Sequence, residues 1–293
     1  MNDIDPSTLS IVLPARYESR NLVTLLPALR VTFPAAEIIL VDDASTDDTP
    51  QICAAHGIRR LHNVQQIGNG ASIKRGARAA SGETIVFMDA DGQHMPQHVV
   101  QLLERFANED LDMLVGARPL ACHAGRLRRW GNVAFNLLAS WMTHQRILDL
   151  TSGLRVVRAR PFREFLHLLP NGFSYPTTST MAFLRSAYTV GYERIEVQQR
   201  QGSSHLNIWR EGVRFLLIIF KIGAMYSPLK LFATISALLF VLATVLYGYT
   251  YFESGRFTNM SALLYMTSLL TFLIGMVSEQ ITSLMYAQRD DQR

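Results

Sequence analysis

The stretch LSIVLPARYESRNLVTLLPALRVTFPAAEIILVDDAST, residues 9–46, decides the fold class. It contains a short β-branched run at Leu9–Leu13, a helical pattern near 18–30 and a second apolar run at Glu37–Val41. Short apolar runs that alternate with helical patterns are typical of strands joined by crossover helices. Because such crossovers join parallel strands, we expect an α/β fold with a layered, parallel sheet.

The same alternation continues to about residue 115 and becomes less regular after it. Further strands are predicted at Ile58–Leu61, Thr84–Met88 and Asp112–Val115, with helices near 48–55, 70–80 and 96–107. Beyond these we expect a helix near 126–145, a loop at Asp149–Gly153 with a short strand after it, a helix near 174–187 and a strand at Ile195–Gln199. Sheets of this kind bind ligands at the carboxyl ends of their strands. The polar clusters that follow strands are therefore the candidate sites: Pro14–Glu18, Asp42–Asp48 and Asp89–Gln93.

Charge is distributed unevenly along the 293 residues. Residues 1–115 carry 15 acidic and 9 basic side chains, whereas residues 116–215 carry 14 arginines, no lysine and 5 acidic side chains. A zone whose basic residues are all arginine favours bidentate contacts with phosphate groups. A merely solvated basic face is the alternative. A net charge of only +4 with 48% hydrophobic residues excludes an intrinsically disordered chain.

The C-terminal part has the composition of a membrane anchor. Leu231–Phe252 and Phe257–Ser278 are each about 22 residues without a charge, which is long enough to cross a bilayer. Basic residues flank the pair, so the positive-inside bias predicts that the loop Glu253–Arg256 lies outside and both flanks lie in the cytoplasm. Residues 207–226 are amphipathic and basic, which favours an interfacial helix over a packed surface helix. The alternative for the two apolar runs is a buried hairpin of a soluble core.

These observations predict four parts and a location. We expect residues 1–205 to form a body of ordinary charge density, 206–228 a juxtamembrane amphipathic segment, 229–288 two transmembrane helices (about 231–252 and 257–279) and 289–293 a cytoplasmic tail. We expect a multi-pass protein of the cytoplasmic membrane whose body, residues 1–205, faces the cytoplasm.

The strongest local motif is TIVFMDADGQH at 84–94, where an apolar strand ends in Asp89 and Asp91. Hard divalent cations take oxygen ligands and keep positions open for substrate phosphates, so this pair suits a metal–diphosphate site. An Asp-rich turn that caps a helix is the alternative. Asp42 and Asp43 likewise follow a strand and suit a ribose or base edge, with turn and capping chemistry as the alternative. Glu18 either stabilises a helix start or binds a ligand.

The order of several motifs resembles the family 2 glycosyltransferases. It runs LPARYESRNL (13–22), VDDASTDDT (41–49), IGNGASIKRG (67–76), FMDADGQH (87–94), GAR (116–118), DLTSGLRVVR (149–158) and RQGSSHL (200–206), followed by a two-span anchor. Within the family the chain looks most like the dolichyl- and polyprenyl-phosphate sugar transferases, such as dolichol-phosphate mannosyltransferases and undecaprenyl-phosphate glycosyltransferases. The resemblance implies a GT-A nucleotide-sugar-binding fold, which is Rossmann-like.

The resemblance also implies roles for individual residues. A nucleoside diphosphate would contact Pro14, Ala15, Arg16, Glu18, Asp43, Asp89 and Ala90, and Mg²⁺ or Mn²⁺ would be held by Asp89, Asp91 and Gln93. The catalytic and acceptor-binding set would be Asp91, Arg118, Arg128, Arg129, Asp149, Ser152, Arg200 and His205, with Gly153 and Arg155 completing the acceptor motif. The chain departs from the family pattern at Arg16–Tyr17, where Tyr and Asn are usual, and at Asn69, where Lys is common.

The implied activity is metal-dependent, inverting transfer of a sugar from a nucleoside diphosphate sugar to an undecaprenyl or dolichyl phosphate at the cytoplasmic membrane face. The implied partners are these two substrates, the membrane and further copies of the chain in a homo-oligomer, without nucleic acid. One alternative is a family 2 enzyme that extends a lipid-diphosphate-linked saccharide; a processive synthase is disfavoured because no QxxRW occurs. The other two are a non-catalytic membrane scaffold of the same fold and a tethered nucleic-acid binder.

Overall fold

The computed structural model describes residues 5–119, 126–172, 174–196 and 226–287, together with 220, 223 and 224. The chain divides into two compact units, Met1–His205 and Leu206–Arg293, and each is described by itself. Most of the predicted juxtamembrane segment, 206–228, lies outside the described residues.

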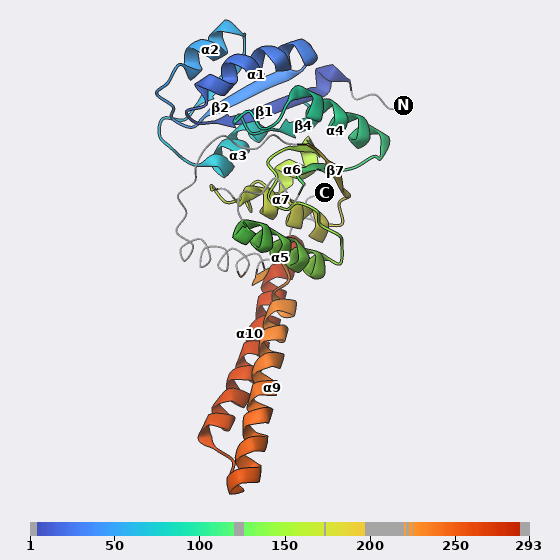
Figure 1. The fold of residues 1–293 in the computed structure, drawn as a ribbon. Coiled ribbons are helices and arrows are strands. Elements are labelled where there is room, and N and C mark those ends of the chain that lie inside the picture. Colours follow the sequence, from blue (N-terminus) through green and yellow to red (C-terminus); the bar gives the residue numbers. More distant parts are fainter. Residues whose placement is uncertain are drawn as a thin grey trace. The chain divides into compact units, whose positions relative to one another are not determined.

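The first unit is built on a seven-stranded sheet with strand order β3-β2-β1-β4-β6-β5-β7. Figure 1 labels β1, β2, β4 and β7 of this sheet. The strands are β1 (Leu9–Ala15), β2 (Glu37–Asp42), β3 (Arg59–His62), β4 (Thr84–Phe87), β5 (Met113–Ala117), β6 (Arg155–Arg158) and β7 (Val190–Arg194). The helices are α1 (Ser19–Thr32), α2 (Thr49–Ala55), α3 (Asn69–Ala79), α4 (Pro96–Asn108), α5 (Arg126–Thr143), α6 (Ala159–Glu164) and α7 (Tyr175–Arg185), with a 3₁₀ turn at Pro6–Thr8. The predicted α/β fold class is confirmed, although α6 was not expected.

Alternation along β1 sends side chains to both faces of the sheet, and helices cover both faces. Ile11 and Leu13 lie in one core cluster with Leu26 of α1 and Leu102 of α4. Val12 points to the opposite face, where α3 packs against β1 and β2. Strands buried on both sides read as continuous apolar runs, which is why the sequence pattern located them.

The parallel arrangement expected for the strands up to residue 115 does not extend to β6, for which the sequence pattern predicted no direction. β1 pairs in parallel with β2 and β4, and β2 with β3, but β6 runs antiparallel between β4 and β5. Its first residue, Arg155, pairs with Phe87 at the carboxyl end of β4. The chain leaves β5 at this end and re-enters the sheet at the same end, so β6 must run in the opposite direction. The loop 149–154 therefore lies at the edge where β4 delivers Asp89.

The strand predicted at Ile195–Gln199 is also misplaced. The structure puts β7 at Val190–Arg194, parallel to β5, while Ile195 and Glu196 follow the strand and 197–199 lie outside the described residues. Gly191, which argues against a strand in the sequence, packs closely against the side chain of Leu111. A Cβ at this position would lie 2.5 Å from Leu111 Cδ1.

The second unit is a hairpin of two apolar helices, α9 (Pro228–Ser254) and α10 (Asn259–Ala287). Both are long and apolar enough to cross a membrane: 18-residue stretches within Pro228–Ser254 and Asn259–Leu284 have mean hydropathies of 2.3 and 1.8. Between the helices, Ser236 Oγ donates to the carbonyl of Ser268 at 2.8 Å, and Ser268 Oγ donates to the carbonyl of Ser236 at 2.9 Å. Each serine hydroxyl thus finds a hydrogen-bond acceptor on the neighbouring helix, in the apolar interior of the pair.

Candidate active site

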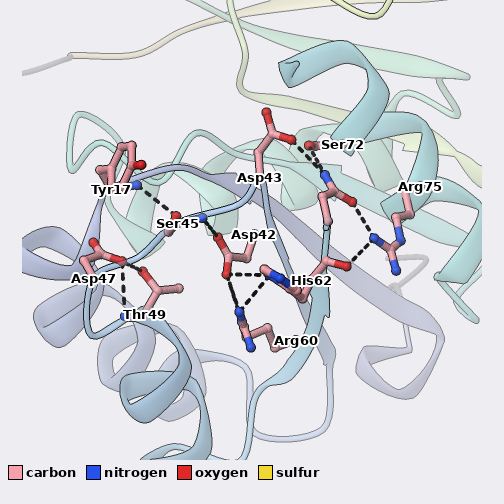
Figure 2. Close-up of polar contacts among 11 residues, drawn as sticks. Tyr17, Asp42, Asp43, Ser45, Asp47, Thr49, Arg60, His62, Ser72 and Arg75 are labelled. Carbon is pink, nitrogen blue, oxygen red and sulfur yellow. Dashed lines mark hydrogen bonds and ion pairs between the residues drawn. The ribbon is translucent and has the colours of Figure 1, made fainter. Parts of the chain in front are cut away.

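The loops that follow β1 and β2 are joined by hydrogen bonds at the carboxyl edge of the sheet. The N–H of Asp43 donates to the carbonyl of Ala15 at 2.9 Å. The N–H of Tyr17 donates to Ser45 Oγ at 3.0 Å (Figure 2). The N–H of Ser19 donates to Asp47 Oδ2 at 3.1 Å. The two segments predicted to hold a nucleotide, 14–18 and 43, therefore lie side by side.

Of the two adjacent carboxylates after β2, Asp42 is bound by its own chain. It is fully buried and accepts Arg60 Nη2 at 2.6 Å, Arg60 Nε at 3.0 Å and the N–H of Ser45 at 2.9 Å (Figure 2). Burial raises the pKa of Asp42, but the hydrogen bonds from Ser45 and the charge of Arg60 outweigh it, and the net pKa lies below the usual range. Asp42 therefore fixes β3 and the Ser45 turn.

This ion pair gives a stability prediction. Arg60→Met is expected to lower the free energy of unfolding by roughly 2 kcal/mol near pH 7, because it leaves a buried carboxylate without its cation. A carboxylate whose folded pKa is depressed stabilises the fold above its unfolded pKa and loses that contribution as pH falls through the folded value. The difference between Arg60→Met and wild type should therefore shrink below about pH 4.

The matched control is Arg59→Met, on the same strand. Arg59 is 52% exposed and pairs with Glu37 at the surface, so its loss is expected to cost less than about 1 kcal/mol. Thermal unfolding of the full-length protein in detergent across pH 3–8 measures both variants. Equal destabilisation by the two substitutions would contradict the structural role given to Asp42.

Asp43 shapes the glycine-rich loop. Its carboxylate accepts Asn63 Nδ2 and the N–H groups of Ile67 and Gly68, each at 2.9 Å. Asn63 is in turn held by Arg75, whose Nη1 also donates to the carbonyl of His62 at 2.6 Å (Figure 2). The part of Asp43 in nucleotide binding stays a prediction.

The start of α3 is bound to a distant segment of the same unit. The N–H of Gly70 donates to the carbonyl of Gly172 at 3.2 Å, and that of Ala71 to the carbonyl of Asn171 at 3.1 Å. Lys74 Nζ donates to Asn171 Oδ1 at 2.6 Å. The N–H groups of Gly70 and Ala71 are therefore already paired with acceptors within the protein. Asn69, between the two fixed glycines, directs its side chain to Asp89 as a hydrogen-bond partner.

The two carboxylates after β4 lie where a cation would be stabilised. Burial, with the charge of Asp91, raises the pKa of Asp89 to about 6, against the opposing charges of Arg118 and Arg155. Asp91 Oδ1 accepts the N–H of Gln93 at 3.1 Å. Two hard oxygen donors that disfavour each other's charge fit a divalent cation such as Mg²⁺ or Mn²⁺. Among the described residues no group of three or more acidic, histidine or cysteine side chains is placed to hold a metal, so diphosphate and water oxygens must complete such a site.

Asp89 faces the segment 149–153. A Cβ added to Gly153 would lie 2.2 Å from Asp89 Oδ2, so the Asp89 carboxylate packs directly against this backbone. On the other side, a Cβ on Gly92 would lie 3.2 Å from Asn21 Oδ1, and Asn21 Nδ2 donates to Glu18 Oε2 at 2.6 Å. The structure thus brings Glu18, Asp89 and the 149–153 loop to one edge of the sheet.

Arg118 and Asp149 form a buried ion pair beside this edge. Arg118 Nε donates to Asp149 Oδ2 at 2.9 Å, and Nη2 donates to Thr151 Oγ1 at 2.8 Å. Burial raises the pKa of Asp149, but the charge and hydrogen bonds of Arg118 outweigh it and hold the pKa below its usual range. Burial lowers the pKa of Arg118, and the charges of Asp149, Asp89 and Asp91 more than offset this. The guanidinium predicted to bind phosphate is therefore oriented by Asp149, within the field of the Asp89–Asp91 pair.

The remaining predicted residues are placed in part. Ser152 is fully buried, and its Oγ has no hydrogen-bond partner among the described residues. Arg128 and Arg129 belong to α5, but their side chains are not described, and Arg200 and His205 lie outside the described residues. The roles assigned to all these residues stay predictions.

The sequence reading missed residues that organise the site. Asn136 of α5 donates from Nδ2 to the carbonyl of Leu148 at 2.8 Å and accepts the N–H of Leu150 at 3.2 Å, which fixes the loop around Asp149. His94, three residues after Asp91, is buried. Burial, with the charge of Arg118, lowers its pKa to about 3, so the imidazole is neutral near pH 7. His94 could have been singled out because it is part of the DADGQH motif. Nothing in the sequence around Asn136 marks it as a site residue.

Comparison with known proteins adds two matches along the chain. Residues 10–188 match the model of glycosyl transferase family 2, and residues 227–284 match the model of the GtrB C-terminal hairpin. The dolichyl-phosphate hexose transferase of Haloferax volcanii is 30% identical over 162 residues, 54% of this chain and 68% of that protein. The undecaprenyl-phosphate mannosyltransferase of Micrococcus luteus is 28% identical over 166 residues, 52% of this chain and 67% of that protein. The chain spans between 27% and 68% of the length of four curated relatives that it matches.

Among solved structures, the fold is similar to that of glucosyl-3-phosphoglycerate synthase from Mycobacterium tuberculosis in complex with Mn²⁺ and UDP-glucose. The TM-score is 0.58 at 22% identity, and the match covers 74% of this chain and 78% of that one. At this identity the likeness shows the fold alone, a GT-A-like mixed α/β sheet.

Proposed function

The chain belongs to glycosyl transferase family 2, and from this premise we propose that it transfers a sugar from a nucleoside diphosphate sugar to a polyprenyl phosphate. The observation that carries the proposal is the meeting of Asp89 with the 149–153 loop beside the Arg118–Asp149 pair, in a chain that also has an apolar helical hairpin. Relatives named as dolichyl- and undecaprenyl-phosphate transferases support the acceptor class.

The donor would lie along the edge formed by the β1 and β2 loops. Tyr17 is half exposed there at the carboxyl end of β1, and Asp43 is fixed below it by the glycine-rich loop. Base and ribose would contact the segment 14–18 and Asp43, which leaves the diphosphate directed at Asp89 and Asp91. This arrangement follows the general rule that ligands of open α/β sheets bind outside the carboxyl ends of the strands.

Asp89, Asp91 and Gln93 would hold Mg²⁺ or Mn²⁺. When bound, the cation would act as a Lewis acid that neutralises charge on the leaving diphosphate. The acceptor phosphate is anionic near neutral pH and needs no general base. A phosphate oxygen would form a bond to the anomeric carbon as the bond from that carbon to the diphosphate oxygen breaks. Single displacement of this kind inverts the anomeric centre.

Arginines would position the acceptor phosphate. Arg118 is held by Asp149 and Thr151 within reach of the charges of Asp89 and Asp91, so it is pre-oriented for a phosphate that approaches this edge. Arg128, Arg129, Arg200 and His205 would complete the acceptor site, together with Ser152. The hairpin α9–α10 would anchor the enzyme in the cytoplasmic membrane, with residues 1–205 on the cytoplasmic side, 206–228 at the interface and 289–293 as a cytoplasmic tail.

The test is a transfer assay with the purified full-length protein in detergent micelles that contain undecaprenyl phosphate. UDP-, GDP- and dTDP-sugars are supplied with Mg²⁺, with Mn²⁺ or with EDTA. We expect one class of donor to give a polyprenyl-phosphate sugar, with loss of product in EDTA. Transfer only to a polyprenyl diphosphate saccharide would favour the lipid-linked extension enzyme instead. No turnover with any donor and either acceptor would favour a scaffold.

A further inference from the structure

Arg155, the first residue of β6, is a cation buried in the interior of the first unit. Its side chain has no exposed surface. Nη1 donates to the carbonyl of Pro176 at 2.9 Å, to Ser179 Oγ at 2.7 Å and to Thr180 Oγ1 at 3.2 Å, and Nη2 donates to the carbonyl of Ser152 at 2.7 Å. These four oxygen acceptors are uncharged carbonyls and hydroxyls. Burying a guanidinium among neutral acceptors is costly, so its retention calls for a reason beyond packing.

The contacts of Arg155 connect the first turn of α7 to the back of the 149–153 loop. Tyr175 Oη donates to the carbonyl of Gly153 at 3.4 Å, and Thr177 Oγ1 donates to the carbonyl of Leu150 at 3.3 Å. With Arg155 on the carbonyl of Ser152, the carbonyls of residues 150, 152 and 153 are all held from one side. The loop is therefore clamped to α7 rather than left as an exposed turn.

The opposite side of the same backbone supports Asp89. The Cα of Gly153 faces the Asp89 carboxylate so closely that an added Cβ would lie 2.2 Å from Oδ2 and 2.7 Å from Cγ. A shift of the Ser152–Gly153 peptide would thus change the space in which this carboxylate sits. Arg155 also places its positive charge within the electrostatic reach of Asp89 and Asp149.

We propose that Arg155 is a positioning residue for Asp89, which it holds in place through the Ser152–Gly153 backbone by tying that backbone to the start of α7. The inference rests on the proposed function, in which Asp89 is a cation ligand. Because its side chain is fully buried, Arg155 would contact neither substrate nor metal directly. It acts as outer-sphere partners of metal ligands do, and loss of such a partner costs 10- to 100-fold in affinity or activity.

Lysine is the informative replacement, because it keeps the positive charge and removes only the second nitrogen donor of the guanidinium. A guanidinium reaches Ser152 through one nitrogen and α7 through the other. A single ammonium nitrogen cannot span both partners. Arg155→Lys therefore releases the loop while leaving the charge near Asp89 unchanged. The matched control is Arg158→Lys on the same strand, where Arg158 is 45% exposed and pairs with Asp110 and Asp112 at the surface.

The experiment measures three quantities on the full-length protein: the dissociation constant for Mn²⁺ alone by electron paramagnetic resonance, kcat and donor KM in the transfer assay, and the thermal unfolding midpoint. For Arg155→Lys we expect the Mn²⁺ dissociation constant to rise about 10-fold and kcat to fall at least as much. Donor KM should change less than about 3-fold, because the β1–β2 edge is untouched. Arg158→Lys should match wild type in all three.

A merely structural role would lower the unfolding midpoint and leave Mn²⁺ affinity and kcat per folded molecule unchanged, and this result would overturn the proposal. If Arg155→Lys does not fold, Ser179→Ala removes one Arg155 acceptor and should shift the same two constants about 3-fold in the same direction. If the wild-type enzyme transfers sugar without metal, only the proposed need for a cation is refuted. The kcat of Arg155→Lys relative to wild type would then still test whether Arg155 positions Asp89. A wild-type protein that binds Mn²⁺ but transfers no sugar would refute the proposed function, and the Mn²⁺ constants would decide.

Discussion

Gly153→Ala is expected to lower kcat about 100-fold while the protein still folds. The added methyl group displaces the carboxylate of Asp89, the proposed cation ligand, and a small misplacement of a group at the reacting centre is costly. The new Cβ would lie 2.2 Å from Asp89 Oδ2 and 3.0 Å from Oδ1, so the carboxylate must move. It cannot move freely, since Asn69 and the start of α3 lie beside it and the loop behind it is clamped to α7. A methyl group at this position therefore separates Asp89 from the place that a cation would occupy.

The control for this variant is Gly172→Ala in the same unit. A Cβ at Gly172 would meet nothing within 4 Å, and its carbonyl, which accepts the N–H of Gly70, is retained. We expect wild-type kcat from Gly172→Ala. Both variants are compared by transfer rate and by Mn²⁺ affinity. Near-normal values for Gly153→Ala would show that the packing of Asp89 against Gly153 is irrelevant to the reaction.

Asp91→Asn is expected to lower transfer by about 1000-fold even at saturating Mn²⁺, on the order of 4 kcal/mol of transition-state stabilisation. The substitution keeps the shape of the side chain and its hydrogen bond from the N–H of Gln93. It removes one of the two negative charges that follow β4. It should also lower the pKa of Asp89, because the charge of Asp91 is one of the causes that raise it.

Asp110→Asn is the control with the same chemical change. Asp110 is 90% exposed and pairs with Arg158 at the surface, away from the β4 loop. It should leave transfer and Mn²⁺ affinity as in wild type. The measurement is the initial rate against Mn²⁺ concentration for the wild type and both variants. If Asp91→Asn reached wild-type turnover at high Mn²⁺, Asp91 would not be an essential ligand.

Local sequence pattern was sufficient for the first half of the first unit. β1, β2 and β4 were found within two residues because strands buried on both faces give unbroken apolar runs. The direction of β6 was not predicted, since periodicity carries no information on which end of a sheet a strand enters. β7 was misplaced because Gly191 weakens the strand pattern, and its close packing against Leu111 can be seen only in the folded structure.

For the candidate site, the sequence identified side chains and could not assign their partners. Asp42 and Asp43 are equivalent in the motif, but Arg60 engages only the first, and the glycine-rich loop only the second. Arg118 and Asp149 belong to the same predicted set of residues, but the motifs did not pair them, because the contact joins positions that are 31 residues apart. The clamp at Arg155 depends on α7, more than 20 positions later in the chain.

The insertion of β6 between β4 and β5 has a consequence for synthesis of the chain. β3, β2, β1 and β4 can pair as soon as they have left the ribosome, but the sheet neighbours of β5 are β6 and β7. β5 therefore waits until residues 155–158 emerge, and the loop 149–153 arrives together with them. A nascent chain released before that point leaves the edges of β4 and β5 open to pairing with other chains. The step that joins β5 to the rest of the sheet through β6 is thus also the step that brings Gly153 to Asp89.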